Sequence, residues 1–252
     1  MIFDRAVAST YIGELKTHLD RKFVPVFTPD TVIDVGDFGA FEDGRFIKKG
    51  NVTNRGLELD IIETQVAAQT FASSGKVNIS PSATVQVGDR KLLAATLRFS
   101  RSKAIVAAFR AGVDRGVRDA DRFADQLARL WMDGELRGDR CVVWHVRRVH
   151  GGTVIVSQDG GNNVALAADP TMLGAPMINF GNLSVNVEFG ASSKAVWTIP
   201  PQDGDLLVSM GVYCWRRHKV KDAFGFEAED AAPGAPIRPS LLSADDLLEQ
   251  LA

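Results

Sequence analysis

The sequence predicts an α+β fold, with a twisted, largely antiparallel β-sheet core and flanking helices. Residues 182–189 alternate polar and apolar side chains without a break, which is the period of a strand with one wet and one apolar face. Shorter runs of the same pattern recur at residues 57–61, 76–80 and 84–87. Other segments place apolar residues at helical spacing, so we expect helices beside the strands.

The first predicted helix covers residues 5–20. Its apolar residues share one face: Val7, Tyr11, Ile12, Leu15 and Leu19. Arg5, Arg21 and Lys22 add positive charge at its ends. The pattern is typical of a surface helix that packs on a core. A basic amphipathic helix that lies on a membrane surface is the alternative.

Strands follow the helix. Residues 23–27 are an apolar run around Pro25, which predicts an edge strand ending in a turn, and residues 32–35 predict a second strand. From residue 57 to residue 109 the pattern is nearly all strand, including residues 91–99 and 104–109. Turns are expected at residues 73–75, 81–82 and 88–89.

A second helix is predicted from about residue 119 to residue 132, with Gly134 as its stop. Its buried face is predicted to hold Phe123, Leu127, Leu130 and Trp131. Residues 141–149 and 153–157 are β-branched runs joined by His150, Gly151 and Gly152, which predicts a hairpin, and residues 159–162 predict another turn. Residues 182–189, 194–199 and 206–215 complete the predicted strands.

The C-terminal segment differs in composition. Residues 227–240 have linker composition. Ser243 then suits a helix N-cap, followed by Asp245 and Asp246, which favour a helix N-terminus. A helix of about two turns does not hold itself in water, so we expect it to dock, either as a simple cap of the fold or with a regulatory role.

The formal net charge is only −2, so the overall charge of the chain does not indicate binding to nucleic acid. Residues 219–252 hold three basic and seven acidic side chains, so the remaining body is mildly basic, at +2. Loss of this segment would therefore weakly favour an anionic membrane surface. No apolar run has the length of a signal peptide core or a membrane helix, so the sequence predicts a protein that is soluble as synthesised.

The two cysteines, Cys141 and Cys214, lie far apart in apolar runs. This position favours buried free thiols over a disulfide or a metal site, and with them a reducing cytosol. The sequence contains no phosphate loop, no zinc-protease motif and no nucleophile elbow, and regular strand geometry would place His145 and His150 on opposite faces. We therefore expect no catalytic residues, no metal and no cofactor, and a protein that is not an enzyme.

The order of these parts resembles a known family. An amphipathic helix precedes Phe23, Val24, Pro25 and Val26, a β-rich body follows, and residues 185–193 and 195–200 come late in the chain. This order resembles the pore-forming domain of the gasdermins, and the length with a short tail is similar to the bacterial members. The resemblance covers essentially the whole chain.

The resemblance implies a division into a pore-forming domain, residues 1–226, and a linker with a short autoinhibitory helix, residues 227–252. It implies a soluble cytoplasmic monomer whose C-terminal segment is removed by a partner protease. The body would then bind membrane lipids, insert two β-hairpins and assemble with further copies into a transmembrane β-barrel pore in the inner membrane. Cell death during antiphage defence follows in the bacterial proteins.

Carried onto this sequence, the resemblance assigns roles to particular residues. The membrane-facing helix would present Arg5, Lys16, Arg21 and Lys22. Inserting hairpins would lie within residues 57–109 and 163–199, with Leu183, Val185, Val187 and Phe189 on an inserting strand. The autoinhibitory tail would use Leu241, Leu242, Leu247, Leu248 and Leu251.

The cleaved bond is expected between Lys219 and Ser240, but not at Arg238, because Pro239 follows it. Bacterial relatives often carry an acylated N-terminal cysteine, whereas Met1, Ile2, Phe3 and Asp4 offer none, so no lipidation is expected. Two other classes stay open. One is a soluble β-rich module that binds a lipid or a protein. The other is an enzyme whose residues converge only in three dimensions.

Overall fold

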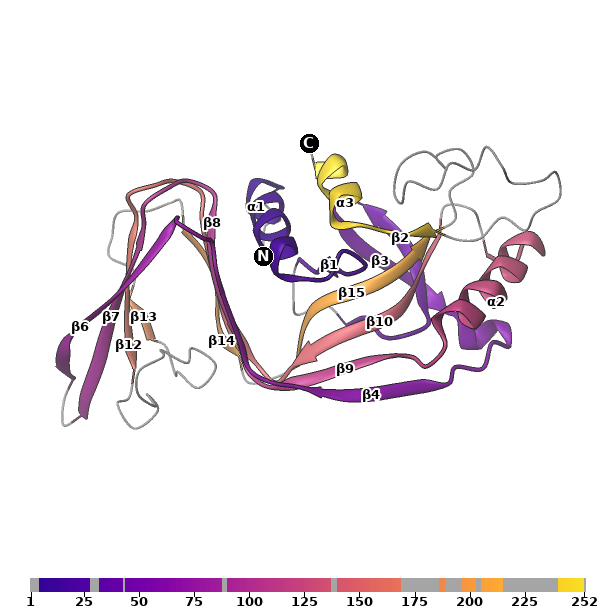
Figure 1. The fold of residues 1–252 in the computed structure, drawn as a ribbon, viewed down its shortest axis with the longest axis horizontal. Coiled ribbons are helices and arrows are strands. Elements are labelled where there is room, and N and C mark those ends of the chain that lie inside the picture. The colour runs from indigo at the N-terminus through magenta and orange to yellow at the C-terminus, as the bar shows by residue number, and fades with distance from the viewer. Residues whose placement is uncertain are drawn as a thin grey trace. The chain divides into compact units, whose positions relative to one another are not determined.

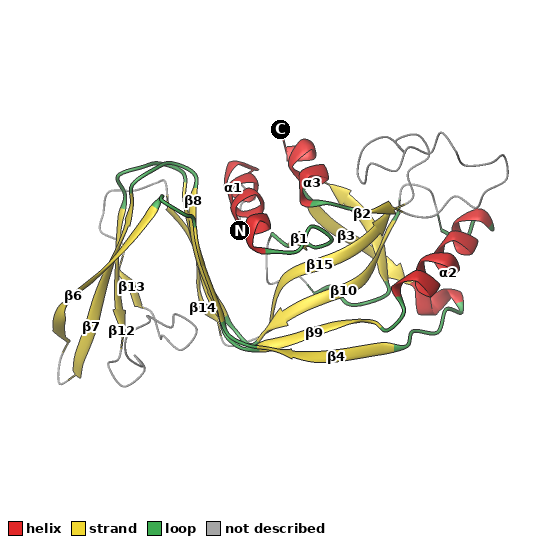
Figure 2. Cartoon of the chain, viewed as in Figure 1, coloured by secondary structure: helices red, strands yellow, loops and turns green. Residues whose placement is uncertain are grey.

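The computed structural model describes residues 5–27, 32–42, 44–87, 90–136, 140–168, 186–188, 196–202, 205–214 and 240–251. Within them the predicted α+β fold is confirmed, because antiparallel sheets are accompanied by α-helices (Figures 1 and 2). The helices are α1 (Arg5–Leu15), α2 (Ala120–Met132) and α3 (Ala244–Leu251). Among the described residues, none of these helices combines the length and the apolar character that crossing a membrane requires.

The strands form three sheets. The eight-stranded sheet contains β1 (Val24–Pro25), β2 (Asp37–Glu42), β3 (Arg45–Asn51), β4 (Ile61–Val66), β9 (Gly112–Val117), β10 (Cys141–Val149), β15 (Leu206–Cys214) and β16 (Ser240–Leu241). A four-stranded sheet contains β5 (Gln69–Ala72), β8 (Ala104–Phe109), β11 (Gly152–Ser157) and β14 (Val196–Gln202). A second one contains β6 (Val77–Val87), β7 (Arg90–Phe99), β12 (Asn163–Ala168) and β13 (Asn186–Glu188).

The chain forms two compact units. The first contains residues 1–18, 65–113 and 148–206, and so holds α1 and both four-stranded sheets. The second contains residues 19–64, 114–147 and 207–252, and so holds most of the eight-stranded sheet with α2 and α3. Each unit is therefore assembled from segments that are distant in the sequence.

Four segments of chain each contribute one strand to every sheet. Segment 1 runs through β4, β5 and β6; segment 2 through β7, β8 and β9; segment 3 through β10, β11 and β12; and segment 4 through β13, β14 and β15. The neighbour order is the same each time: β15-β10-β9-β4, β14-β11-β8-β5 and β13-β12-β7-β6. Each segment therefore keeps the same neighbours in all three sheets, and we call these strands the four-segment array.

The predicted hairpin at residues 141–157 is wrong, because β10 and β11 are successive parts of segment 3. β11 pairs with β8, where Gly152 lies opposite Phe109. The residues that link β8 to β9 pair with those that link β10 to β11. The Arg110 N–H donates to the Gly151 carbonyl, and the His150 N–H donates to the Ala111 carbonyl, each at 3.0 Å. Gly151, with a φ of 109°, allows the chain to change sheet without reversing direction.

Two other predicted turns and strands differ from the structure. Residues 32–35 form no strand, because the Asp34 N–H donates to the Asp37 carboxylate at 2.8 Å and the Asp37 N–H donates to the Asp34 carbonyl at 3.1 Å. This reciprocal contact makes a turn before β2. Pro81 lies inside β6 at a register shift rather than in a turn. Because β6 is an edge strand, a proline at a bulge is tolerated there.

The first helix ends earlier than predicted. Helix α1 stops at Leu15 and a single 3-10 turn follows over Lys16–His18. The Thr17 hydroxyl donates to the Glu14 carbonyl at 2.8 Å, so a side chain takes a carbonyl that helix continuation would use. Helix α1 packs against β8 and β11, and a 2.6 Å ion pair joins Glu14 to Lys76.

Helix α2 confirms its prediction. The Asp119 carboxylate caps the N-terminus by accepting from the Arg122 N–H at 2.9 Å. Gly134, with a φ of 74°, follows the end of the helix. The four residues expected on the inner face are buried: Phe123, Leu127, Leu130 and Trp131. Capping and periodicity therefore determine this element locally.

Gly112→Ala tests the close backbone approach where segment 2 meets segment 3. A Cβ atom at Gly112 would overlap the backbone at Arg148 and Val149, so we expect the free energy of unfolding to fall by about 1–3 kcal/mol. Gly13→Ala in α1 is the matched control, since a Cβ there meets nothing within 4 Å. The control should raise stability by about 0.5–1 kcal/mol. Urea unfolding measures both, and equal effects would contradict the packing argument.

Candidate functional site

One edge of β15 is paired with two short strands, β1 and β16, which come from opposite ends of the chain. All nine residues of β15 are buried, and its other edge pairs with β10. At the covered edge, β1 pairs where Pro25 lies opposite Ser209, and β16 pairs where Leu241 lies opposite Tyr213. An uncovered strand edge is a template for pairing with another chain. The C-terminal segment therefore occupies a surface on which a second chain could pair.

The residues after β16 add further contacts that stabilise the pairing of β16 with β15. The Leu242 N–H donates to the Val212 carbonyl at 2.9 Å, and the Leu242 side chain is buried. Ser243 and Asp246 then form a reciprocal cap: the Ser243 N–H donates to the Asp246 carboxylate at 2.8 Å, and the Asp246 N–H donates to the Ser243 hydroxyl at 3.3 Å. The predicted N-cap at Ser243 is confirmed.

The leucines predicted for the tail take different positions. Leu242 and Leu247 are buried, at 3% and 0% exposure, while Leu241 and Leu248 are half-buried. Leu251 lies at the end of α3. The short helix is thus docked, as its length requires. The sequence did not reveal that residues 240 and 241 form a strand, since two residues carry no periodicity.

The cysteine prediction is wrong. Cys141 and Cys214 form a disulfide with an S–S distance of 2.06 Å, so neither is a free thiol. They lie in adjacent strands, β10 and β15, although 73 residues separate them in the sequence. Strand pairing brings the two Cα atoms to 4.2 Å. The expectation of a reducing cytosol was based on free thiols, and this basis is lost because both cysteines are in a disulfide.

The basic residues predicted to face a membrane divide between the two units. Arg5 is exposed in α1 and Lys16 is half-buried in the 3-10 turn, both in the first unit. Arg21 and Lys22 are exposed in the second unit, after the helical residues have ended. Lys22 lies 3.7 Å from Asp20. Arg21 and Lys22 therefore do not belong to the helix.

Only part of the predicted inserting strand and cleavage segment is described. Val187 lies in β13, opposite Leu166 of β12. Leu183, Val185 and Phe189 lie outside the described residues, as do residues 219–239 of the cleavage segment.

A histidine with an unusual environment lies in β10. The His145 ring is 4.5 Å from the Phe23 ring, and its Nε2 atom is 3.9 Å from the Asp114 carboxylate. Burial lowers the pKa of His145 to about 4, against the opposing effect of Asp114. Asp114 itself is held by two 2.7 Å hydrogen bonds from Arg147. The charges of Asp114 and Arg147 are therefore paired with each other next to the His145 ring.

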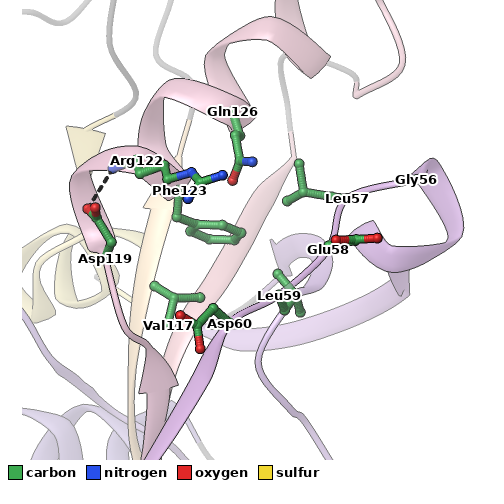
Figure 3. A pocket seen from close by; sticks show the side chains of 10 residues that line it. All are labelled: Gly56, Leu57, Glu58, Leu59, Asp60, Val117, Asp119, Arg122, Phe123 and Gln126. Atoms are coloured by element: carbon green, nitrogen blue, oxygen red, sulfur yellow. Dashed lines mark hydrogen bonds between the residues drawn. The ribbon is translucent and has the colours of Figure 1, made fainter.

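A pocket of about 500 Å³ lies beside α2 (Figure 3), a volume in the range of small-molecule sites. It is lined by Gly56, Leu57, Glu58, Leu59, Asp60, Val117, Asp119, Arg122, Phe123 and Gln126. His145 is not among these residues. Two of the carboxylates already have structural partners, because Asp119 caps α2 and Asp60 accepts from Arg118 at 2.9 Å.

These side chains offer neither a hydroxyl or thiol nucleophile nor a histidine base at the pocket. In the part of the chain that the structure describes, no three side chains of the histidine, cysteine, aspartate and glutamate types gather as metal ligands would. None of the family models and none of the curated proteins compared with the chain matches it. The sheet edge and the four-segment array are therefore the features of the described residues that bear on function.

Lowering the pH should destabilise the fold through His145. The pKa of His145 has its ordinary value of 6.5 in the unfolded chain and is about 4 in the folded one. Between these two pH values the unfolded state therefore binds more protons than the folded state. The free energy of unfolding should fall by up to about 3 kcal/mol as the pH drops through this window. Urea unfolding at several pH values measures the fall, and His145→Gln should remove this component. An identical pH dependence in the variant would contradict the assignment.

Leu247→Ala should loosen the tail. Truncating this buried leucine removes about 2–5 kcal/mol of packing from the docked segment, so the Leu242 amide should exchange with solvent at least about tenfold faster. Hydrogen exchange read by NMR measures the change. Glu249→Ala, at an exposed position on the same helix, is the matched control and should leave exchange unchanged. Equal protection in both variants would show that α3 does not hold β16 in place.

Proposed function

We propose that this chain is the autoinhibited precursor of a gasdermin-like pore-forming protein, activated when a protease removes its C-terminal segment. The observation that carries the proposal is the pairing of β16 with the edge of β15, backed by the buried Leu242 and Leu247. A segment that covers a strand edge prevents other chains from pairing there. Its removal makes that edge available to a second copy of the body.

The four-segment array supports the proposal. β6 pairs with β7 from Val77 opposite Phe99 to Val87 opposite Arg90, and β12 pairs with β13. These two pairs belong to the sheet farthest along the array from β15. Because every segment keeps the same neighbours throughout, the strands can lengthen without exchanging partners. β6 and β7 form a long antiparallel pair of the kind that a membrane-inserting hairpin requires, whereas β12 and β13 pair over three residues.

The membrane imposes the need for several copies. Within a bilayer every backbone N–H and C=O must be paired, so strands insert only when their edges are closed by neighbouring strands. Bound membrane lipids and further copies of the chain are thus the proposed partners after cleavage. Before cleavage, the linker keeps α3 and β16 at a high local concentration beside β15. Cutting between Lys219 and Ser240 ends that tethering, so the segment can leave.

By its resemblance to the bacterial gasdermins, we assign the physiological role to cell killing in antiphage defence. The inactive monomer would stay in the cytoplasm, and the pore would form in the inner membrane. A ligand-binding module is the second candidate, and the pocket beside α2 favours it, because apolar Leu57 and Phe123 lie next to polar Gln126. Such a module would bind a small molecule and would not permeabilise membranes.

Dye release from anionic liposomes tests the proposal. A recognition sequence for a site-specific protease replaces part of residues 227–239, and the intact and cut proteins are compared. The cut protein should release the dye and the intact protein should not. The unmodified chain treated with the same protease is the control and should stay inactive. If neither form leaks while both remain folded by circular dichroism, the pore proposal fails and the ligand-binding module is preferred.

A further inference from the structure

We infer that the Cys141–Cys214 disulfide is a thiol–disulfide regulatory site that controls how fast the C-terminal segment leaves after cleavage. This inference rests on the proposed function and deepens its regulation. It requires that the disulfide and the tail act on the same part of β15, and that breaking the bond loosens that part. The contacts of β15 supply both requirements.

The described part of the tail pairs with the last residues of β15. Ser240 lies opposite Cys214, Leu241 lies opposite Tyr213, and the Leu242 N–H donates to the Val212 carbonyl. Cys214 is the final residue of the strand. One of the two disulfide residues is therefore itself a pairing partner of the tail.

The other half of the disulfide is anchored inside the sheet. Cys141 is the first residue of β10 and lies opposite Gly39 of β2. β2 in turn pairs with β3 from Asp37 opposite Asn51 to Glu42 opposite Arg45. The disulfide thus ties the end of β15 to a strand that is held on its far side by a hairpin.

The crosslink opposes fraying at the position where the tail binds. Strand ends open locally at a lower free energy than the core of a sheet. While the disulfide is intact, Cys214 cannot move away from β10, and the pairing surface for β16 is preserved. Once it is reduced, residues 212–214 open more often, and each opening removes backbone partners of the tail.

Reduction and cleavage should act together. Before cleavage, the linker returns a dissociated tail to β15 quickly, so reduction alone has little effect. After cleavage nothing returns the tail, and its dissociation rate sets the rate of activation. The protein therefore responds most strongly when a protease has cut it and a reductant has broken the bond.

The chemistry needs a thiol reductant of the dithiol or glutathione class. A reductant thiolate attacks one sulfur of the disulfide, a mixed disulfide forms, and the other cysteine leaves as a thiolate. A second reductant thiol then releases the first cysteine, so two electrons reduce the bond and the reductant becomes a disulfide. Cys141 and Cys214 are only 9% and 5% exposed, so attack requires the end of β15 to open.

The test measures tail dissociation from the cut protein. A fluorophore is attached to the C-terminus, the linker is cut, and excess unlabelled tail peptide captures the vacated edge while anisotropy is followed. Protein treated with dithiothreitol should lose its tail about tenfold faster than oxidised protein, as expected when the net contribution of about one hydrogen bond is lost. Mass spectrometry of alkylated thiols verifies the redox state. Equal rates, or slower release after reduction, would overturn the inference.

A double variant, Cys141→Ser with Cys214→Ser, separates the bond from other effects of the reductant. It should release its tail at the fast rate with or without dithiothreitol. Dependence of the variant on dithiothreitol would overturn the inference, as would release at the slow rate. If the variant does not fold, reduced wild-type protein with alkylated cysteines replaces it. Leakage by cut, oxidised protein tests pore formation separately, so the inference can fail while the proposed function stands.

Discussion

The need to pair the backbone groups along the edge of β15 is the constraint on which the arrangement of both chain ends depends. β15 is buried along its whole length, yet among the described residues one of its edges is paired with short strands alone. Two short strands fill the position, β1 with a proline and β16 from the C-terminal segment. Because Pro25 lacks an N–H, β1 cannot extend the sheet as a full strand does. The edge is therefore covered by only a few paired residues.

Only two residues of the C-terminal segment, Ser240 and Leu241, pair with β15 as a strand, so the residues that follow must help to hold the segment in place. Two paired residues bind weakly by themselves, so the buried Leu242 and Leu247 and the Ser243 cap supply the remaining stabilisation. The disulfide acts on the other partner, because it fixes the last residue of β15 against β10. The proposed activation by proteolysis and the inferred effect of reduction thus converge on the same few backbone groups.

The array of four segments explains how a folded body could change shape while its strands remain paired. The four segments keep the same order in all three sheets, so residues could pass from one sheet to the next without a change in that order. Several charged groups of the second unit have structural partners: Asp119 caps α2, Asp60 pairs with Arg118, and Asp114 pairs with Arg147. These groups hold the scaffold on which the edge is presented.

The sequence by itself determined the elements that depend on local physics: the buried face of α2, the cap at Ser243, the edge position of Pro25 and the alternating pattern within β6, whereas the same pattern at residues 57–60 forms no strand. Each follows from periodicity or from a contact within a few residues. Only the tertiary structure decided which strands are neighbours, that residues 141–157 cross between two sheets, and that Cys141 meets Cys214 across 73 residues. The physical reason is that strand pairing satisfies backbone groups with no regard to sequence distance, so local patterns carry no information about the partner.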